Sequence, residues 1–411
     1  ESIPFLNSEE SKREYNSILV ESYAELADYN QFNNLINNLP LISKVQTKSL
    51  YNSFFVGIYK YHGISKLKQM LVLMDDEILR DFIIERVCMF AISDALAKDH
   101  NLEVLLPLVS QNAIKEQIKV LLIEYFIKES KLEKAKNILA TLDFPNQREL
   151  SFSKMAIAYA QVVDYDRCKK MLVEISNVDL KTETIINIIQ AFLDKSMQSI
   201  ALELLSELDS DAREKSMVMF IKAYAKEAKF DSALQFFSSM KSNENIQKSL
   251  PYLSIGFAHA EEYESMDQAL LLIKDPKAYN ITLAKIALIY AEKGLFEYSI
   301  ETAQKINDTS FELNTLENIA YIFGKQKNIN AALLIINQFE SDEKKNKCIA
   351  KLIYSVLEEG KYELAFTLLL EIKDEIVAQE VVYNSLILLL NSNKEAQLPK
   401  FEEQIKHLNT V

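Results

Sequence analysis

Few side chains in this sequence combine the residue types and spacings that catalysis or metal binding requires. The four histidines lie far apart, and none belongs to an HExxH pair, which places two imidazoles on one helix face for zinc. The three cysteines form no CxxC pair, so we expect small buried hydrophobes and neither a disulfide framework nor a zinc site. These residues are His62, His100, His259 and His407, and Cys88, Cys168 and Cys348.

The acidic and glycine-rich patterns of enzymes are missing as well. The run Asp75-Asp76-Glu77 continues with Ile78 and Leu79, so it lacks the last acid of a metal-binding DDxxD motif. Acids at a helix N-terminus explain the run equally well. The sequence contains neither GxxxxGK[ST] nor GxGxxG, which cradle phosphates. The sequence predicts no catalytic residue, no metal and no cofactor, and therefore a protein that is not an enzyme.

Two sets of side chains have chemistry suited to binding instead. Tyr321 and Tyr354 occupy equivalent places in adjacent repeats, and tyrosine next to charge is a good anchor for a bound segment. Lys222 and Lys226 lie one helical turn apart and could receive a carboxylate. The alternatives are an ordinary, partly buried tyrosine pair between repeats and a solvated lysine pair.

Composition limits the class of protein and partner. The formal net charge is −13, which disfavours nucleic acid and anionic membranes and favours a basic or neutral protein partner. Six glycines and seven prolines in 411 residues leave little turn chemistry for hairpins, so we expect an all-helical chain. No apolar run approaches the ~18 residues of a membrane span, so no membrane insertion is expected. The start at Glu1 suggests a trimmed N-terminus; a cytoplasmic location is expected, with a removed targeting segment as the alternative, and the oligomeric state stays open.

A 33-residue period runs through the chain. A large apolar or aromatic residue, here called the anchor, recurs at this spacing, and seven of eight anchors are Phe or Tyr. A large apolar residue four before each anchor and a small or apolar residue three before it predict a first helix. A residue nine after the anchor that is small in most repeats, followed by apolar residues at thirteen and sixteen, predicts a second helix. The eight anchors are Phe126, Tyr159, Phe192, Tyr224, Phe257, Tyr290, Phe323 and Val356.

The pattern varies at a few places. Toward the N-terminus the anchors become Tyr23, Ile58 and Ser93, spaced by 35 residues. After Phe257, the turn 259–266 is predicted to be about three residues longer than in other units. Pro251 is expected in the first turn of a helix, where proline is tolerated. The last polar-faced segment, 397–408, is expected to cap the stack.

The sequence thus predicts an all-α fold, a right-handed superhelical α-solenoid of about twelve helix–turn–helix repeats of ~33 residues. We expect one solenoid over 1–411: divergent repeats over 1–118, regular repeats over 119–373 and capping helices over 374–411.

The segment from about Lys119 to Lys373 resembles the tetratricopeptide repeat. The family places Leu-Gly three to four residues before a Tyr and an Ala nine after it. The resemblance is to a degenerate form, because the residue sixteen after each anchor is large and the closing Pro is mostly absent. The clearest matches are Phe152, Met155, Ala156, Tyr159 and Cys168 in one unit and Leu283, Ile286, Ala287, Tyr290, Gly294 and Ser299 in another.

In such a stack, the first helices line the concave face, and residues two before and two after each anchor point into it. Some family members grip a C-terminal carboxylate through Asn at these two places, and no such Asn accompanies the eight anchors, so that clamp is not expected. The predicted partner-binding residues are Glu124, Lys128, Gln161, Gln190, Asp194, Lys222, Lys226, His259, Glu292, Tyr321, Lys325, Tyr354 and Glu358.

The resemblance implies a non-catalytic scaffold that binds a peptide or helical segment of a partner protein on its concave face. Two alternatives stay open. A structural subunit of a larger assembly requires apolar patches on the convex face or at the ends. A helical-repeat enzyme requires acids or histidines that converge in a pocket.

Overall fold

The computed structural model of this protein describes residues 9–39, 43–93, 101–326, 328–337, 339 and 341–391. Within these ranges all regular structure is helical, and no strand occurs. The chain divides into two compact units, Glu1–Leu208 and Asp209–Val411, which are described separately.

The first unit contains helical hairpins in chain order. Its helix α3 is interrupted at Gly63, whose φ of 75° lies in the left-handed region, so the helix forms both arms of one hairpin. Its elements are α1 (Glu9–Glu25), α2 (Tyr29–Asn38), α3 (Lys44–Leu71), α4 (Glu77–Ser93), the 3-10 helix η2 (Leu102–Leu108), α5 (Asn112–Lys128), α6 (Leu132–Leu139), α7 (Pro145–Gln161), α8 (Tyr165–Val173), α9 (Val178–Asp194) and α10 (Gln198–Leu205).

The second unit continues the same alternation of a 17-residue first helix and a shorter second helix. Its elements are α11 (Ser210–Lys226), α12 (Phe230–Ser239), α13 (Asn243–His259), α14 (Tyr263–Leu271), α15 (Pro276–Glu292), α16 (Phe296–Gln304), α17 (Thr309–Lys325), α18 (Ile329–Ile336), α19 (Asp342–Glu358), α20 (Tyr362–Leu369) and α21 (Glu375–Asn391).

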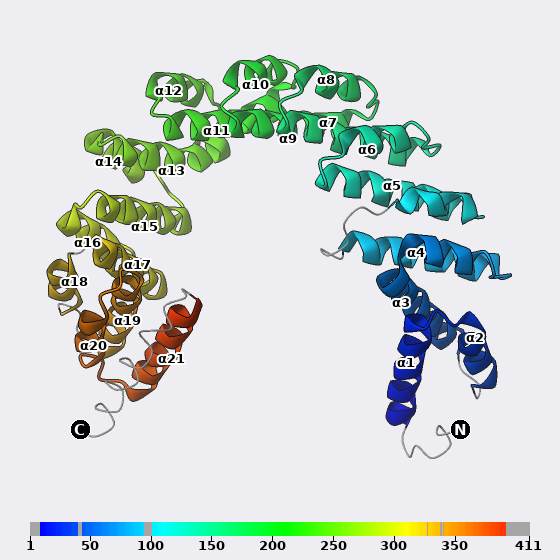
Figure 1. The fold of residues 1–411 in the computed structure, drawn as a ribbon. Helices are drawn as coiled ribbons and strands as arrows, with labels where there is room; N and C mark the ends of the chain where they lie inside the picture. The colour runs from blue at the N-terminus through cyan, green and yellow to red at the C-terminus, as the bar shows by residue number, and fades with distance from the viewer. Residues whose placement is uncertain are drawn as a thin grey trace. The chain divides into compact units, whose positions relative to one another are not determined.

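Each unit is a stack of hairpins in two layers. In the second unit, α11, α13, α15, α17, α19 and α21 each pack against the next, and α12, α14, α16 and α20 pack mainly on their own first helices (Figure 1). The described residues contain eleven hairpins and one further first helix, α21. The prediction of an all-α solenoid of about twelve repeats is confirmed.

The anchors form the centre of the core, as the period predicts. The anchors Phe126, Phe192, Phe323 and Val356 are at most 1% exposed, and so is Tyr159. The small residues nine after the anchors are buried against them, because two helices can approach closely only where one side chain is short. These small residues are Ala135, Cys168, Ala201, Ala233, Ser299, Ala332 and Ala365.

Each anchor also accepts the hydrogen bond that ends its helix. The backbone N–H of Asp164 donates to the carbonyl oxygen of Tyr159 at 2.9 Å, and that of Val163 donates to Ala160 at 3.0 Å. This is the Schellman ending, and it requires a left-handed residue four positions after the anchor. Glycine fills that position at Gly294 and Gly360; in other described repeats it is Ala27, Ser130, Val163, Ser196, Ala228 or Glu261.

A polar side chain ten residues before the anchor ties one repeat to the next. The carboxylate of Glu214 accepts the backbone N–H of Lys241 at 3.0 Å and of Ser242 at 2.5 Å, at the start of the next first helix. These donors have no partner within their own helix, so the side chain from the preceding repeat satisfies them. Equivalent acceptors are Asp81, Glu116, Glu149, Gln247, Asn280 and Asn346.

Two local predictions are wrong. The turn between α13 and α14 has the ordinary length, because Met266 simply occupies the position that is small in most repeats and is 4% exposed there. Pro251 lies in the middle of α13 and not in its first turn, so the helix lacks one backbone donor at this point.

The third N-terminal repeat also differs from its prediction. Ser93 is exposed at the end of α4, and Ala91 is the buried residue, 1% exposed, 33 residues after the buried Ile58. The second arm is the 3-10 helix η2, which contains Pro107. A 3-10 helix has three residues per turn, so Leu105 is buried there and Leu106 is not.

Other parts of the predicted organisation stay predictions. The expected capping segment 397–408 lies outside the described residues. The division between the units, after Leu208, falls within the stretch 119–373 for which regular repeats were predicted. The right-handed superhelix and the continuity of one solenoid over 1–411 stay predictions.

Candidate functional site

The first helices of each unit carry three rows of side chains on the face that their second helices leave open. The rows lie five before, two before and two after the anchor, and here they are called the inner rows. On α19 these residues are Lys351 and Tyr354, both half-buried, and Glu358, which is exposed. Positions five and two before the anchor are three apart, so they lie on one helix face. The two hollows described below are lined largely by these rows.

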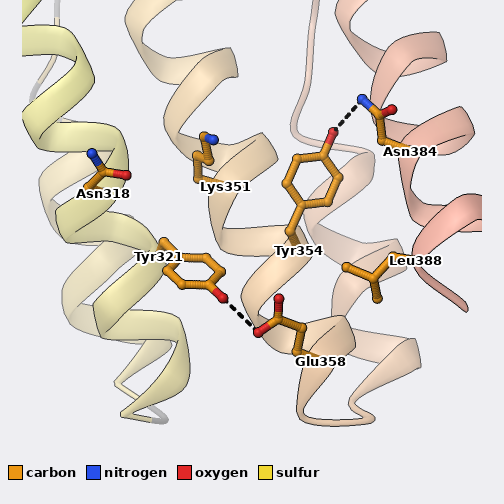
Figure 2. A pocket seen from close by; sticks show the side chains of 7 residues that line it. All are labelled: Asn318, Tyr321, Lys351, Tyr354, Glu358, Asn384 and Leu388. Carbon is orange, nitrogen blue, oxygen red and sulfur yellow. Dashed lines mark hydrogen bonds between the residues drawn. The ribbon is translucent and has the colours of Figure 1, made fainter. Parts of the chain in front are cut away.

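The candidate site is a hollow of about 340 Å³ in the second unit. It lies across the three consecutive first helices α17, α19 and α21, and Figure 2 shows its side chains. Two predicted tyrosines and a predicted glutamate come together here with four residues that were not predicted. The hollow is lined by Asn318, Tyr321, Lys351, Tyr354, Glu358, Asn384 and Leu388.

Glycine brings two of these helices close together. A Cβ at Gly324 on α17 would lie 1.6 Å from Oγ and 2.8 Å from Cβ of Ser355 on α19. No side chain fits at that distance, so α17 and α19 pack as closely as they do only because residue 324 is glycine. The contact lies next to the anchors Phe323 and Val356, and it sets the separation of Tyr321 and Tyr354.

One edge of the hollow is a closed polar cluster. The hydroxyl of Tyr321 donates to Oε2 of Glu358 at 2.6 Å, and the ammonium of Lys325 lies 3.0 Å from the same oxygen. Lys325 also lies over the Tyr321 ring, 4.8 Å from its centroid. Burial and the bond to Glu358 raise the pKa of the Tyr321 phenol, so this hydroxyl is a donor at neutral pH. Hydrogen bonds to Tyr321 and Glu358 raise the pKa of Lys325.

The other edge is held by an amide. Nδ2 of Asn384 on α21 donates to the hydroxyl oxygen of Tyr354 at 3.3 Å, and Leu388 lies beside this pair (Figure 2). Burial raises the pKa of the Tyr354 phenol, which therefore stays neutral. Lys351 lies one turn before Tyr354 on α19 and pairs with no carboxylate of the described residues. With Glu358 paired to Lys325, Lys351 gives the lining residues and Lys325 together one net positive charge. A further carboxylate, that of Glu380, acts on Tyr354.

A second hollow lies in the first unit, between α7 and α9. Its volume is about 460 Å³, and it contains three of the predicted binding residues. The amide of Gln190 donates to Oδ1 of Asp194 at 2.7 Å. No aromatic side chain lines it, so it lacks the flat anchor of the other hollow. Its lining residues are Ile157, Gln161, Asn187, Gln190, Ala191, Asp194 and Lys195.

The remaining predicted residues lie on the inner rows outside both hollows. Glu124 pairs with Lys154 from the next first helix, and Lys222 lies over the ring of Tyr252 at 5.5 Å. The other four, which are exposed, are Lys128, Lys226, His259 and Glu292. Their role in binding a partner stays a prediction.

The row five before the anchor was not among the predicted site residues. Asn318, Lys351 and Asn384 all belong to it, and their spacing of 33 residues was available as a signal. The residue five before the anchor lies one helical turn before the residue two before it, so both are on the same face of the helix. Leu388 follows no row, since it lies directly before the buried Leu389.

Metal ligands, membrane-spanning helices and reactive cysteines are the other features to consider among the described residues. They contain no group of three or more His, Cys, Asp and Glu that could hold a metal ion. None of their helices has the length and apolar character needed to cross a membrane. Cys88, Cys168 and Cys348 are buried as predicted, and burial raises the pKa of each thiol to about 12, which suppresses the reactive thiolate.

Comparison with known proteins adds little to this description. No protein-family model matches the chain, and no curated protein does. The crystal structure of Ton1535 from Thermococcus onnurineus NA1 is 13% identical over 74% of this chain and 99% of that one, with a TM-score of 0.27. A circular tandem repeat protein with novel repeat topology is 10% identical over 97% of this chain and 94% of that one, with a TM-score of 0.16. TM-scores this low do not establish a shared fold.

Proposed function

We propose that this protein is a tetratricopeptide-like scaffold that binds a peptide or helical segment of a partner protein on the inner rows of its second unit. The hollow across α17, α19 and α21 is its central contact. Tyrosines are among the side chains that dominate binding energy at protein interfaces, because they bury a large ring and offer a hydroxyl. Two of them, on adjacent helices, line this hollow.

The observation that carries the proposal is the fixed geometry of these tyrosines. Tyr321 is held by Glu358 and Tyr354 by Asn384, so both hydroxyls have partners without any ligand. A ligand therefore loses little affinity to ordering these side chains, which otherwise costs about 0.5–1.5 kcal/mol for each rotamer-rich group. The volume of about 340 Å³ is at the lower end of small-molecule pockets, and fits a few side chains of a segment.

The test is selection of displayed peptides against the full-length protein. We expect wild-type protein to enrich a set of related peptides and the Tyr354→Ala variant to bind them at least tenfold more weakly, as expected for an interface residue that contributes more than about 1.4 kcal/mol. The matched control is Tyr298→Ala on α16, which removes a tyrosine that is 60% exposed and lies outside the hollow.

Three outcomes decide the proposal. Loss of binding in Tyr354→Ala together with unchanged binding in Tyr298→Ala supports it, provided that circular dichroism shows both variants folded. Equal binding by wild type and Tyr354→Ala removes the hollow as the contact. Failure of the wild-type protein to enrich any peptide contradicts peptide binding itself.

A further inference from the structure

The inner rows of the second unit carry a charge opposite to that of the whole chain. The protein has a net charge of −13, yet these rows contain five lysines and only two glutamates. His259 is the one histidine on them. The charged residues are Lys222, Lys226, Lys285, Lys325 and Lys351, with Glu292 and Glu358.

The lysines differ in whether a carboxylate neutralises them. Lys325 is paired with Glu358. Lys222 lies over the Tyr252 ring, and among the described residues no carboxylate pairs with it or with the other three. These four lie on alternate first helices: Lys222 and Lys226 on α11, Lys285 on α15 and Lys351 on α19. Cations without a counter-charge on one face of an acidic protein favour an anionic ligand there.

The separation of these helices fixes the spacing of the ligand's charges. Adjacent packed helices lie about 8–10 Å apart, so lysines on alternate first helices are about 16–20 Å apart. An extended chain advances about 3.3 Å per residue. Carboxylates that meet successive lysines are therefore roughly five or six residues apart along an extended segment.

The same spacing argues against nucleic acid. A nucleic-acid strand carries one charge on every nucleotide, so most of its phosphates would face no lysine on these rows, while Glu292 and Glu358 would repel them. Asn318 on α17 instead lies between the helices of Lys285 and Lys351, and Asn384 lies on α21 beyond Lys351; their amides match the backbone of a peptide. The whole-chain charge predicts a basic or neutral partner. At contact distance, however, the charges of this face act on the ligand more strongly than the distant charges of the chain, because salt screens the distant ones.

Resting on the proposed function, we propose that the second unit binds an extended, internal segment of a partner protein with acidic residues spaced five or six positions apart. One carboxylate meets Lys351 at the hollow, beside Tyr354 and Leu388. The next meets Lys285 on α15, and a third meets the lysine pair on α11. Because the contacts are side-chain carboxylates, the segment needs no free C-terminus.

The experiment uses a random peptide library displayed between fixed flanking sequences, so that no free C-terminal carboxylate is present, and the full-length protein. We expect enriched peptides to share two or three Asp or Glu positions five or six residues apart. The Lys351→Glu variant is expected to bind these peptides at least tenfold more weakly than wild type. It is also expected to select Lys or Arg at one of those positions. Lys305→Glu, which makes the same charge change at an exposed residue after α16, is the control and is expected to keep the acidic preference.

The outcomes separate this inference from the proposed function. Enriched peptides without acidic positions, or an acidic preference that Lys351→Glu leaves unchanged, overturn the inference and leave the scaffold proposal standing. No enriched peptide at all defeats both. Binding of a single-stranded oligouridine that Lys351→Glu abolishes would assign the face to nucleic acid and overturn the acidic-segment proposal.

Discussion

Tyr321 on α17 donates its hydroxyl hydrogen to Oε2 of Glu358 on α19 at 2.6 Å, across 37 residues of sequence. Lys325, one turn after Tyr321, reaches the same carboxylate oxygen at 3.0 Å. The three side chains join two consecutive first helices at the rim of the hollow. Because Glu358 is neutralised there, the charge that the hollow presents to a ligand is that of Lys351.

The Tyr321→Phe variant tests how much this hydrogen bond stabilises the second unit. It keeps the ring under Lys325 and removes only the hydroxyl, so we expect the free energy of unfolding to fall by about 1 kcal/mol, more if the loss leaves Glu358 poorly satisfied. Urea unfolding measures the difference. Tyr298→Phe, at an exposed tyrosine without a hydrogen bond among the described residues, is expected to change it by less than about 0.5 kcal/mol. Equal values for the two variants would show that the Tyr321 hydroxyl contributes nothing to the stability of the second unit.

The buried pair of Glu116 and Lys119 makes the first unit sensitive to acid. Burial alone would raise the pKa of Glu116, but the hydrogen bond from Lys119 at 2.6 Å and those from the backbone N–H groups of Asp143 and Phe144 outweigh burial and lower it. A carboxyl group whose pKa is lower in the folded than in the unfolded state stabilises the fold fully above its unfolded pKa, about 4.3. That contribution is lost as the pH falls from there through the folded pKa.

The Glu116→Gln variant isolates this effect, because glutamine has the shape of the protonated acid. We expect wild type to be more stable than the variant by an amount that is constant between pH 7 and about pH 5 and shrinks below about pH 4.3. Urea unfolding of both proteins across this range measures the difference. A difference that grows on acidification would mean that the pKa of Glu116 is raised and not lowered.

The helices and the core were predictable because their signal repeats. Aromatic anchors such as Tyr159 and Phe323 recur at the same helical phase, and small residues such as Ala201 recur nine positions after an anchor. The 33-residue period therefore revealed both arms of the hairpin. The period did not reveal what joins one repeat to the next. Glu214 and Gln247 take the same place ten before the anchor, but one is acidic and one is an amide, and only their contacts with the following backbone show that they act alike.

The site was predictable only in part. The tyrosines and Glu358 were found because they lie two residues from an anchor. Lys351 and Asn384 were missed because the row five before the anchor alternates in type, and no single residue type marks it. The closeness of α17 and α19 could not be read from Gly324 alone, because a glycine next to an anchor gives no indication of the serine on the facing helix.

The non-glycine left-handed residues that end first helices were also not predicted from the sequence, and one of them leads to a testable prediction. Val163 adopts a φ of 63°, in the left-handed region, where a β-branched side chain is strained. The Val163→Gly variant relieves this strain, although glycine makes the unfolded chain more flexible. We expect a net stabilisation of about 1 kcal/mol in thermal or urea unfolding. Gly294→Val makes the reverse change at the equivalent place, where φ is 76°, and is expected to destabilise by a similar amount or more. A destabilising Val163→Gly would mean that packing of the valine outweighs its strain.

The contact between Gly324 and Ser355 predicts the effect of a single methyl group. In the Gly324→Ala variant the new Cβ would lie 2.8 Å from Cβ of Ser355 and 2.9 Å from Cδ1 of Leu352, so rotation of the serine hydroxyl alone does not relieve the clash. Alanine favours a helix over glycine by about 1 kcal/mol, but overpacking of a tight contact costs about 1–3 kcal/mol or more. We expect the second unit to lose about 1–2 kcal/mol in urea unfolding.

The matched variant restores the space from the other side. Ser355→Gly removes the Cβ and hydroxyl that the new methyl group meets, so the double variant Gly324→Ala, Ser355→Gly is expected to be more stable than the sum of the two single changes predicts, by at least 1 kcal/mol. Additive effects would show that the two residues do not limit the approach of α17 and α19. Because Tyr321 and Tyr354 lie on these same two helices, separation of the helices also widens the hollow. Gly324→Ala should therefore weaken binding of any peptide selected by the wild-type protein, and the double variant should recover it.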